Sequence, residues 1–281
     1  MLSFFNKSFG AVNYAKFRPT YPKRLLEYVI QYHQENGGSK PKLTVDLACG
    51  TGQATSMLAG FSDKVVGLEF SESMIEQARQ KSQSANVEFD VGNELSLTKR
   101  CSPSSVDLLT VAEGAHWLKY PDFWIQSAEI LRPGGTLALF AYWTFSLPEY
   151  PEVAEIIEQY AYGDDQCGPY WNKGREILDN RYQALADTIP ESFTNVEYHV
   201  NLYDRLRPNE PFELVRDEVP LDAVIGMLKT WSAYFNFKEA NPDKPDIADE
   251  VMEKINAVTN LTREDKVLIK WNTVYILGTK K

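Results

Sequence analysis

The sequence predicts an α/β fold with a mostly parallel sheet, and three observations support this prediction. An apolar run, Leu43–Leu47, leads into two closely spaced glycines, Gly50 and Gly52, as a buried strand does when a tight turn and a helix follow it. A second apolar run, residues 65–68, comes after one helical segment. With 281 residues, of which 43% are hydrophobic, the chain is long enough to bury such a sheet between helices.

The turn after the first strand is the predicted cofactor site. Gly50 and Gly52 allow positive φ and let a ligand approach the main chain, and the helix that starts there offers unpaired N–H groups. Asp46 stands four positions before the first glycine. Glu69 ends the second strand, 17 positions beyond Gly52, and a carboxylate at this spacing suits the two hydroxyls of a ribose.

Two classes of cofactor use such a turn. A dinucleotide site favours a third glycine or an alanine, but the corresponding residue here is Thr55, and Asp46 would repel a pyrophosphate. An acidic residue before the glycines suits the zwitterionic tail of S-adenosylmethionine, which also carries an adenosine. The pattern therefore favours S-adenosylmethionine and keeps a nicotinamide dinucleotide as the alternative.

These residues resemble a known family. The segment 46–52 matches the D-x-A/G-C-G-T-G motif of the class I S-adenosylmethionine-dependent methyltransferases, and L-R-P-G-G at 131–135 is a further turn of that class. The resemblance implies a Rossmann-like class I methyltransferase fold, with a seven-stranded, mostly parallel sheet, an antiparallel last strand and an inserted helical cap. It also implies cofactor contacts from the turn and the second strand, namely Asp46, Ala48, Gly50, Thr51, Gly52 and Glu69.

The N-terminal segment precedes the sheet. Tyr14 and Arg18 belong to a Y-x-x-x-R-P-x-Y-P pattern, and a helix with one apolar face is predicted to start at Pro22. In a subgroup that includes trans-aconitate methyltransferases, this segment folds over the cofactor as a lid. The resemblance makes Tyr14 and Arg18 candidates for contact with the methionine carboxylate or the substrate, and the alternative is an aromatic staple and a surface arginine.

Alternating apolar runs and polar turns predict the elements up to residue 142. Helices are predicted at 53–61, after Ser71 as N-cap, and at 122–131, and strands at 86–91, 105–111 and 136–142. Phe70 and Met74 flank the expected adenine slot, although each is as consistent with a core position. An acidic or amide side chain after the third strand bonds adenine in this family, so Asn93 and Glu94 are both candidates.

The end of the fourth strand is the predicted active site, because open α/β sheets bind ligands at the carboxyl ends of their strands. Glu113, His116 and Trp117 follow that strand, and A-x-x-x-H-W recurs in the subgroup. Glu113 is a candidate cofactor ligand, and His116 and Trp117 are candidate catalytic residues. His116 suits a base for a hydroxyl or amine nucleophile, whereas a carboxylate needs none and leaves His116 a structural role.

The later connections are predicted to form a substrate cap. An inserted region at 144–190 contains an aromatic loop with two cations, strands are predicted at 193–203 and 212–219, and an amphipathic helix at 221–235. A further helix and a closing strand at 267–277 complete the chain. The candidate substrate-binding residues are Trp143, Tyr170, Trp171, Arg175, Trp231 and Tyr234.

We expect one methyltransferase domain over residues 1–281. Its parts are a lid segment at 1–40, a cofactor-binding core at 43–142, substrate cap insertions at 143–265 and a closing strand at 266–281.

Composition narrows the partners. Residues 1–145 carry 14 basic and 14 acidic side chains, so the net charge of −10 falls on the rest, and nucleic acid is a poor partner for it. No apolar run suggests a membrane span, and the N-terminus lacks the pattern of a secretory signal. The three cysteines have neither metal-ligand spacing nor the even count of a disulfide framework, so we expect no metal and a reducing, cytoplasmic location. A monomer or dimer is expected.

Four later motifs suggest the substrate class. G-P-Y-W, T-W-S-A-Y, N-P-x-K-P-D-I-A-D and W-N-T-x-Y resemble the group that contains the yeast trans-aconitate 3-methyltransferase and the related cantharidin methyltransferase. The predicted function is O-methylation of a carboxylate on a small, trans-aconitate-like acid. The alternatives are methylation of another small molecule or a macromolecule, a nicotinamide-dependent dehydrogenase, and a non-catalytic S-adenosylmethionine sensor.

Overall fold

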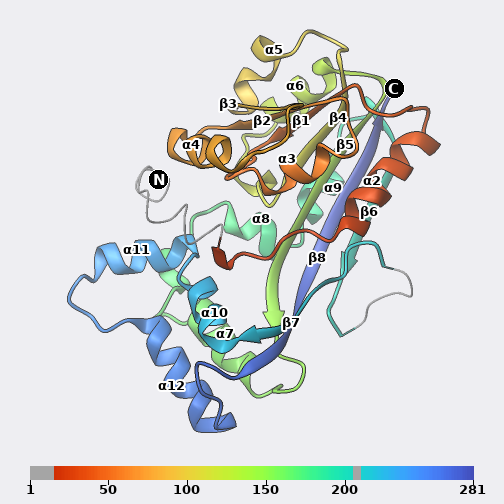
Figure 1. Ribbon diagram of the computed structural model, residues 1–281. Coiled ribbons are helices and arrows are strands. Elements are labelled where there is room, and N and C mark those ends of the chain that lie inside the picture. The colour runs from red at the N-terminus through yellow and green to blue at the C-terminus, as the bar shows by residue number, and fades with distance from the viewer. Residues whose placement is uncertain (1–15, 205–209) are drawn as a thin grey trace. The chain divides into compact units, whose positions relative to one another are not determined.

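The computed structural model describes residues 16–204 and 210–281, in which the chain forms two compact units (Figure 1). The sheet unit consists of Thr20–Trp143, Glu176–Glu213 apart from 205–209, and Thr273–Lys281. The helical unit consists of residues 16–19, Thr144–Arg175 and Leu214–Asn272. The earlier division into lid, core, cap and closing strand stays a prediction.

Within the described residues, the sheet has eight strands: seven lie in the order β3-β2-β1-β4-β5-β8-β6, and β7 (Leu214–Pro220) also pairs with β8. The first five pair in parallel, and β8 runs antiparallel to β6. Figure 1 shows β8 in blue beside β5 in green. The strands are β1 (Leu43–Leu47), β2 (Lys64–Glu69), β3 (Val87–Val91), β4 (Val106–Ala112), β5 (Leu131–Ser146), β6 (Phe193–Asn201) and β8 (Lys266–Lys280).

The central strands have the continuous apolar sequences that are typical of parallel strands buried on both faces. Every residue of β4 except Ala112 is buried, as expected for a strand covered on both faces. The register places Asp46 of β1 opposite Gly67 of β2 and Thr110 of β4, so the ends of neighbouring strands meet at one edge of the sheet. The predicted mostly parallel sheet with its antiparallel last strand is thus confirmed, but the predicted number of seven strands is wrong for the described residues, because β7 adds an eighth strand by pairing with β8.

Helices and turns of the sheet unit connect these strands. The helix predicted after Pro22 is confirmed as α2, and its apolar face is buried through Leu25, Leu26, Val29 and Ile30. The elements are α2 (Lys23–Glu35), α3 (Gln53–Leu58), α4 (Glu72–Lys81), η1 (Glu94–Ser96), α5 (Leu97–Arg100), η2 (Ala115–Trp117), α6 (Asp122–Ile130), α8 (Arg175–Asp179) and α9 (Gln183–Asp187).

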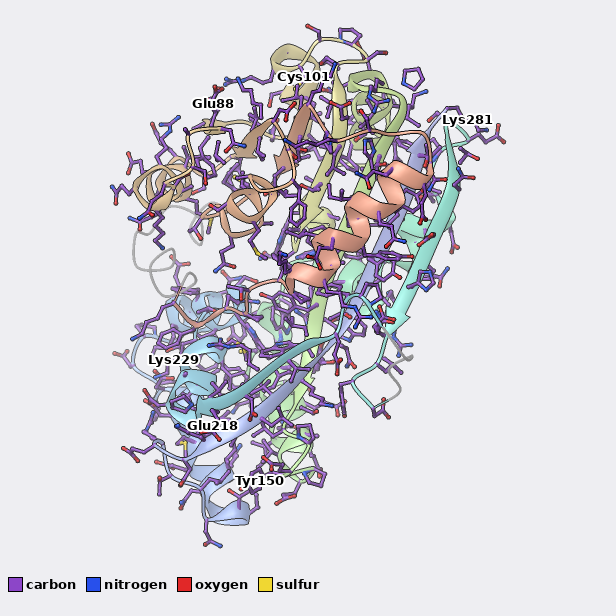
Figure 2. The ribbon with its side chains drawn as sticks, turned by 45° about the vertical axis from the view of Figure 1, so that its right-hand side comes forward. Glu88, Cys101, Tyr150, Glu218, Lys229 and Lys281 are labelled. Carbon is purple, nitrogen blue, oxygen red and sulfur yellow. The ribbon has the colours of Figure 1, made fainter. Side chains whose placement is uncertain are left out.

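The helical unit is built from short helices and an eighth strand. Within it, α7 and α10 pack against α12, and α11 packs against η3. The strand β7 pairs with the first part of β8, and Glu218, which is labelled in Figure 2, lies at a bulge in this pairing. Its carboxylate forms an ion pair with Lys266. The elements are α7 (Val153–Tyr162), η3 (Gly168–Tyr170), β7 (Leu214–Pro220), α10 (Leu221–Leu228), α11 (Ser232–Ala240) and α12 (Ile247–Thr259).

The single helix predicted at 221–235 is wrong, because the chain forms two helices there. The Thr230 hydroxyl donates a 2.6 Å hydrogen bond to the Met227 carbonyl, which offers the backbone an alternative to helix continuation. Trp231 is extended, with φ −72° and ψ 140°, and α11 starts after it. Periodicity alone did not reveal this break, since apolar residues continue across it.

The strand predicted at 136–142 is also longer than expected. β5 begins at Leu131, which pairs with Val106, and the register shifts before Thr136 pairs with Leu108. The glycines at 134 and 135 thus lie in an irregular stretch of the strand rather than in a turn before it. Among the described residues, no helix has the length and apolar character needed to cross a membrane.

Candidate functional site

The turn between β1 and α3 has an unusual backbone. Ala48, Gly50 and Gly52 have φ values of 56°, 56° and 82°, in the left-handed region that glycine adopts without strain. Ala48 has a side chain and still adopts this conformation, which costs about 1–3 kcal/mol. Such strain is common at ligand-binding turns. The predicted glycine turn is therefore present in the form that the sequence suggested.

Asp46 stabilises this turn through hydrogen bonds inside the protein. The side chain is 0% exposed, and its two carboxylate oxygens accept hydrogen bonds from the hydroxyls of Thr55 at 2.6 Å and Thr110 at 2.7 Å. These bonds link β1 with α3 and β4. Burial raises the pKa of Asp46 to about 6, although the threonine bonds oppose this shift. The described contacts of Asp46 are thus internal, and its predicted contact with a cofactor stays a prediction.

Glu69 links the turn to the end of β2. One carboxylate oxygen accepts a hydrogen bond from the Gly50 amide at 3.1 Å, and the other accepts one from the Ser71 amide at 3.0 Å. The side chain is 5% exposed, and burial raises its pKa. Each carboxylate oxygen has two acceptor positions, so these bonds leave capacity for ligand hydroxyls.

Close packing brings the ends of β1 and β4 together. A Cβ atom added to Gly114 would lie 2.6 Å from the Cβ of Ala48, so only glycine allows this approach. The next residue upstream, Glu113, has a φ of 57°, and its carboxylate accepts a 2.8 Å hydrogen bond from the Tyr142 amide. The predicted cofactor residue Glu113 therefore lies on the loop that adjoins the glycine turn.

The predicted adenine residues differ in exposure. Phe70 is 46% exposed, whereas Met74 is buried in α4. Asn93 is exposed and caps η1 by accepting a 3.1 Å hydrogen bond from the Leu95 amide. Glu94 is buried and accepts a 3.3 Å bond from the backbone amide of Lys119. The choice between Asn93 and Glu94 as adenine ligand stays open.

His116 has a partner that sequence analysis missed. The side chain is buried, and its Nδ1 atom lies 2.9 Å from the hydroxyl oxygen of Tyr182. The Trp117 ring lies 4.8 Å from the imidazole. Tyr182 belongs to the region that we predicted to be inserted, 66 positions from His116, and no motif marks it. Only the folded chain brings these two side chains together.

Part of the predicted substrate set gathers in the helical unit. The Arg175 guanidinium lies 4.3 Å from the Trp171 ring centroid and donates a 3.0 Å hydrogen bond to the Tyr162 hydroxyl. The Trp171 and Trp231 rings are 5.5 Å apart. We call Tyr162, Trp171, Arg175 and Trp231 the aromatic cluster.

Two other predicted substrate residues have separate contacts in the helical unit. Tyr170 packs against Phe237 and accepts a 2.9 Å hydrogen bond from Asn241. The Tyr234 hydroxyl donates a 2.8 Å bond to Asp246. These bonds hold both side chains within the packing of the unit.

Three predicted residues remain, namely Arg18, Trp143 and Tyr14. In the helical unit, the Nε atom of Arg18 donates a 2.8 Å hydrogen bond to the Thr230 hydroxyl. Trp143 is buried in the hydrophobic core of the sheet unit. Tyr14 lies outside the described residues, so its predicted role is untested.

Within the described ranges 16–204 and 210–281, no group of three or more His, Cys, Asp or Glu residues could hold a metal ion. All three cysteines are free and buried, and burial raises the pKa of Cys49, Cys101 and Cys167.

The turn suits a ligand with hydroxyl groups. Thr51 is buried in it, and its hydroxyl oxygen has no hydrogen-bond partner within the part of the chain that the structure describes. A buried hydroxyl without a partner is costly in a folded protein, and a bound ligand would satisfy it. Together with the remaining acceptor capacity of Glu69, this fits the ribose and tail of S-adenosylmethionine.

Comparison with known proteins identifies the family. Residues 45–139 match the model of the methyltransferase domain. The chain is 30% identical, over 99% of its length and 98% of the relative, to the probable S-adenosylmethionine-dependent methyltransferase CRG1 of Saccharomyces cerevisiae. It is also 30% identical to a putative methyltransferase of Dictyostelium discoideum, over 99% of this chain and 96% of that one.

A solved structure shows the same fold. The structure of a putative type II methyltransferase from Anaeromyxobacter dehalogenans superposes with a TM-score of 0.71 at 24% identity, covering 94% of this chain and 98% of that one. With these matches, the chain belongs to the S-adenosylmethionine-dependent methyltransferases, and its fold is the Rossmann-like fold of that family. The nicotinamide-dependent dehydrogenase, which the glycine turn alone left open, has no support from these relatives.

Proposed function

We propose that this methyltransferase transfers the methyl group of S-adenosylmethionine to a carboxylate of a small organic acid, giving a methyl ester and S-adenosylhomocysteine. The observation that carries the choice of a carboxylate is the pairing of His116 with Tyr182. This bond engages the imidazole nitrogen Nδ1 within the protein. A carboxylate is already ionised at neutral pH and accepts a methyl group without a base.

The cofactor would be held by the turn and the strand ends of the sheet unit. Glu69 would accept hydrogen bonds from the ribose hydroxyls, and the Thr51 hydroxyl would form a hydrogen bond with a further polar group of the cofactor. Asp46 would keep the turn in shape through its threonine bonds. S-adenosylmethionine supplies an electrophilic methyl group on a sulfonium. The protein's part in such a transfer is alignment of the acid and exclusion of water.

The resemblance of the later motifs to trans-aconitate and cantharidin methyltransferases supports an acid as the substrate. Arg175 is our candidate for pairing with a carboxylate that does not react, because a planar guanidinium can bind a carboxylate through two parallel hydrogen bonds. Its stacking on Trp171 restricts the side chain before any acid binds.

The experiment is a screen of mono-, di- and tricarboxylic acids with donor labelled in the transferred methyl group. We expect base-labile methyl esters from at least one acid. In parallel, a protein extract and total RNA serve as macromolecular acceptors, and calorimetry measures donor binding. Labelling of a macromolecule but of no acid would contradict the proposed substrate class. Bound donor without turnover on any acceptor would instead indicate a sensor.

A further inference from the structure

The turn between β1 and α3 begins where the pairing of two strands ends. In the register of β1 and β4, the last paired residues are Asp46 and Thr110. Beyond them the backbone enters the left-handed conformation at Ala48, which is uncommon for a residue with a side chain. Such a conformation persists only where the surrounding structure enforces it. The side chains of the last pair are therefore in a position to hold the turn against β4.

Two threonine hydroxyls bond the carboxylate of Asp46. Thr55 of α3 donates to one oxygen at 2.6 Å, and Thr110 of β4 donates to the other at 2.7 Å. The Val45 carbonyl is a second and longer acceptor for Thr110, at 3.4 Å. Because its two oxygens are bonded from two different elements, the carboxylate is held against rotation. Asp46, Thr55 and Thr110 are all 0% exposed, so solvent does not compete for these bonds.

Packing alone does not account for either threonine. Valine has nearly the same shape, and the neighbours of Thr110 in β4, Leu109 and Val111, are apolar. A hydroxyl buried at such a position is costly unless it is hydrogen-bonded, and a charged acceptor gives it a strong bond. Thr55 stands where a dinucleotide motif has glycine or alanine, neither of which has a hydroxyl to donate to Asp46.

We infer that Thr55 and Thr110 are positioning residues for the cofactor. By fixing Asp46, they hold the glycine turn, before any donor is present, in the conformation that the donor binds. A site ordered in advance binds its ligand more tightly, because binding does not include the cost of ordering the site. The consequence for S-adenosylmethionine rests on the proposed placement of the cofactor at this turn, whereas the order of the turn itself does not.

Cys49, which lies within the turn, allows the order of the turn to be measured without a ligand. Its thiol is buried, as are those of Cys101 and Cys167, so each reacts with N-ethylmaleimide only when its surroundings open. Mass spectrometry of peptides from partly labelled protein gives the rate at each cysteine separately. Cys49 reports on the turn, and Cys101 reports on opening elsewhere in the sheet unit.

The test variants are Thr55→Val and Thr110→Val, which remove one hydroxyl each and keep the branched side chain. The matched control is Thr44→Val. Thr44 also lies in a central strand and is 0% exposed, and its hydroxyl lies 2.7 Å from that of Ser62 and makes no described contact with Asp46. Thermal melts confirm that each variant folds.

The rates at Cys49 test the hold on the turn. In both test variants we expect Cys49 to react about 10-fold faster or more, the worth of one hydrogen bond to a charged group, with little change at Cys101. In the control, Cys49 should react no faster relative to Cys101 than in wild type. Thr55→Ser and Thr110→Ser keep the hydroxyl and should recover most of the loss. If Cys49 and Cys101 react faster by the same factor in the test variants, the inference is overturned, because the hydroxyls then stabilise the unit as a whole.

Calorimetry with S-adenosylmethionine measures the consequence for the cofactor. Both test variants should bind the donor about 3- to 30-fold more weakly than wild type, because part of the binding free energy then orders the turn. The control should bind the donor as wild type does. Wild-type donor affinity in both test variants would overturn the positioning role.

The variant Glu69→Gln separates this inference from the proposed cofactor site. Weaker donor binding in Glu69→Gln together with wild-type binding in both threonine variants would overturn the inference and leave the site in place. Wild-type binding in all three would overturn the site and the positioning role together. If donor binding behaves as expected but no acid is methylated, the proposed substrate class fails and the inference stands.

Discussion

The glycine turn of the sheet unit and the aromatic cluster of the helical unit are held together by different means. At the turn, carboxylates near the strand ends accept hydrogen bonds from threonine hydroxyls or backbone amides of neighbouring segments, as with Asp46 and Glu69. In the aromatic cluster, rings and a guanidinium contact one another through their side chains. The turn thus depends on backbone conformation, and the cluster on side-chain packing.

We therefore expect the two regions to tolerate amino-acid substitutions to different degrees. A substitution in the turn alters the backbone around which the cofactor site is built, so its effect on stability is large. A substitution in the cluster alters side-chain packing and charge but does not change the backbone of the turn. We expect damage at the turn to reach folding and donor binding, and damage in the cluster to be confined to the acid.

The largest effect is expected for Gly52→Ala. Gly52 has a φ of 82°, and an added Cβ would lie 2.6 Å from the Phe89 ring, so strain and a clash act together. We expect the free energy of unfolding to fall by about 2–5 kcal/mol. Gly37→Ala is the control, because its φ is 97° but nothing lies within 4 Å of an added Cβ. Chemical denaturation should show a loss of only about 1–2 kcal/mol there; equal losses would contradict the role of the Phe89 contact.

A second test concerns the buried charge of Asp46. Its folded pKa of about 6 lies above the ordinary value of 3.8, so the folded state binds protons more readily than the unfolded state. The contribution of Asp46 to stability therefore rises as pH falls through about 6 and levels off below 3.8, by about 3 kcal/mol in all.

The measurement for Asp46 compares wild type with Asp46→Asn. Other groups, such as His33, whose pKa is lowered by burial, titrate in both proteins. Their contributions to the free energy of unfolding therefore cancel in the difference. Denaturation at several pH values between about 4 and 7 should show the wild type gaining stability relative to Asp46→Asn as pH falls. A constant difference would mean that Asp46 has an ordinary pKa.

Glu69→Gln tests the cofactor role of the same region. The substitution keeps the shape of the side chain but removes the charge that strengthens acceptance from two hydroxyls, so donor binding should weaken by about 1.5–3 kcal/mol. Calorimetry measures it, and binding of the acid should change little. Glu88→Gln, at an exposed position on β3 (Figure 2), is the control and should bind donor as wild type does. Unchanged donor affinity in Glu69→Gln would place Glu69 outside the cofactor site.

The smallest effect is expected in the aromatic cluster. Arg175→Lys loses the planar stacking on Trp171 and two-point binding of a carboxylate, so acid affinity should fall by about 1 kcal/mol while donor affinity and folding stay unchanged. Steady-state kinetics on acids of one to three carboxylates should show the greatest loss with the tricarboxylates. Arg263→Lys, which changes an arginine paired with Asp222 and Asp249, controls for loss of any guanidinium in the unit. Wild-type kinetics in Arg175→Lys would remove Arg175 from the substrate site.

Much of the cofactor region was predictable because its signals are local. The glycine turn, the acidic ends of β1 and β2 and the buried face of α2 each follow from residues close together in the chain. Glycine spacing reflects backbone conformation, and apolar periodicity reflects burial, so both are written into short segments. The family and its cofactor follow from the same motifs.

The hydrogen-bond partners of the site residues are set by the folded chain and not by local sequence. The bond of Asp46 to Thr110 spans 64 positions and that of His116 to Tyr182 spans 66, and nothing near either residue indicates the other. At the break between α10 and α11, the Thr230 hydroxyl likewise donates a hydrogen bond to the Met227 carbonyl, which the apolar periodicity of the segment does not indicate. A sequence specifies which groups can donate and accept, but the choice of partner is made by packing, because hydrogen bonds form between whichever groups the folded backbone brings within about 3 Å.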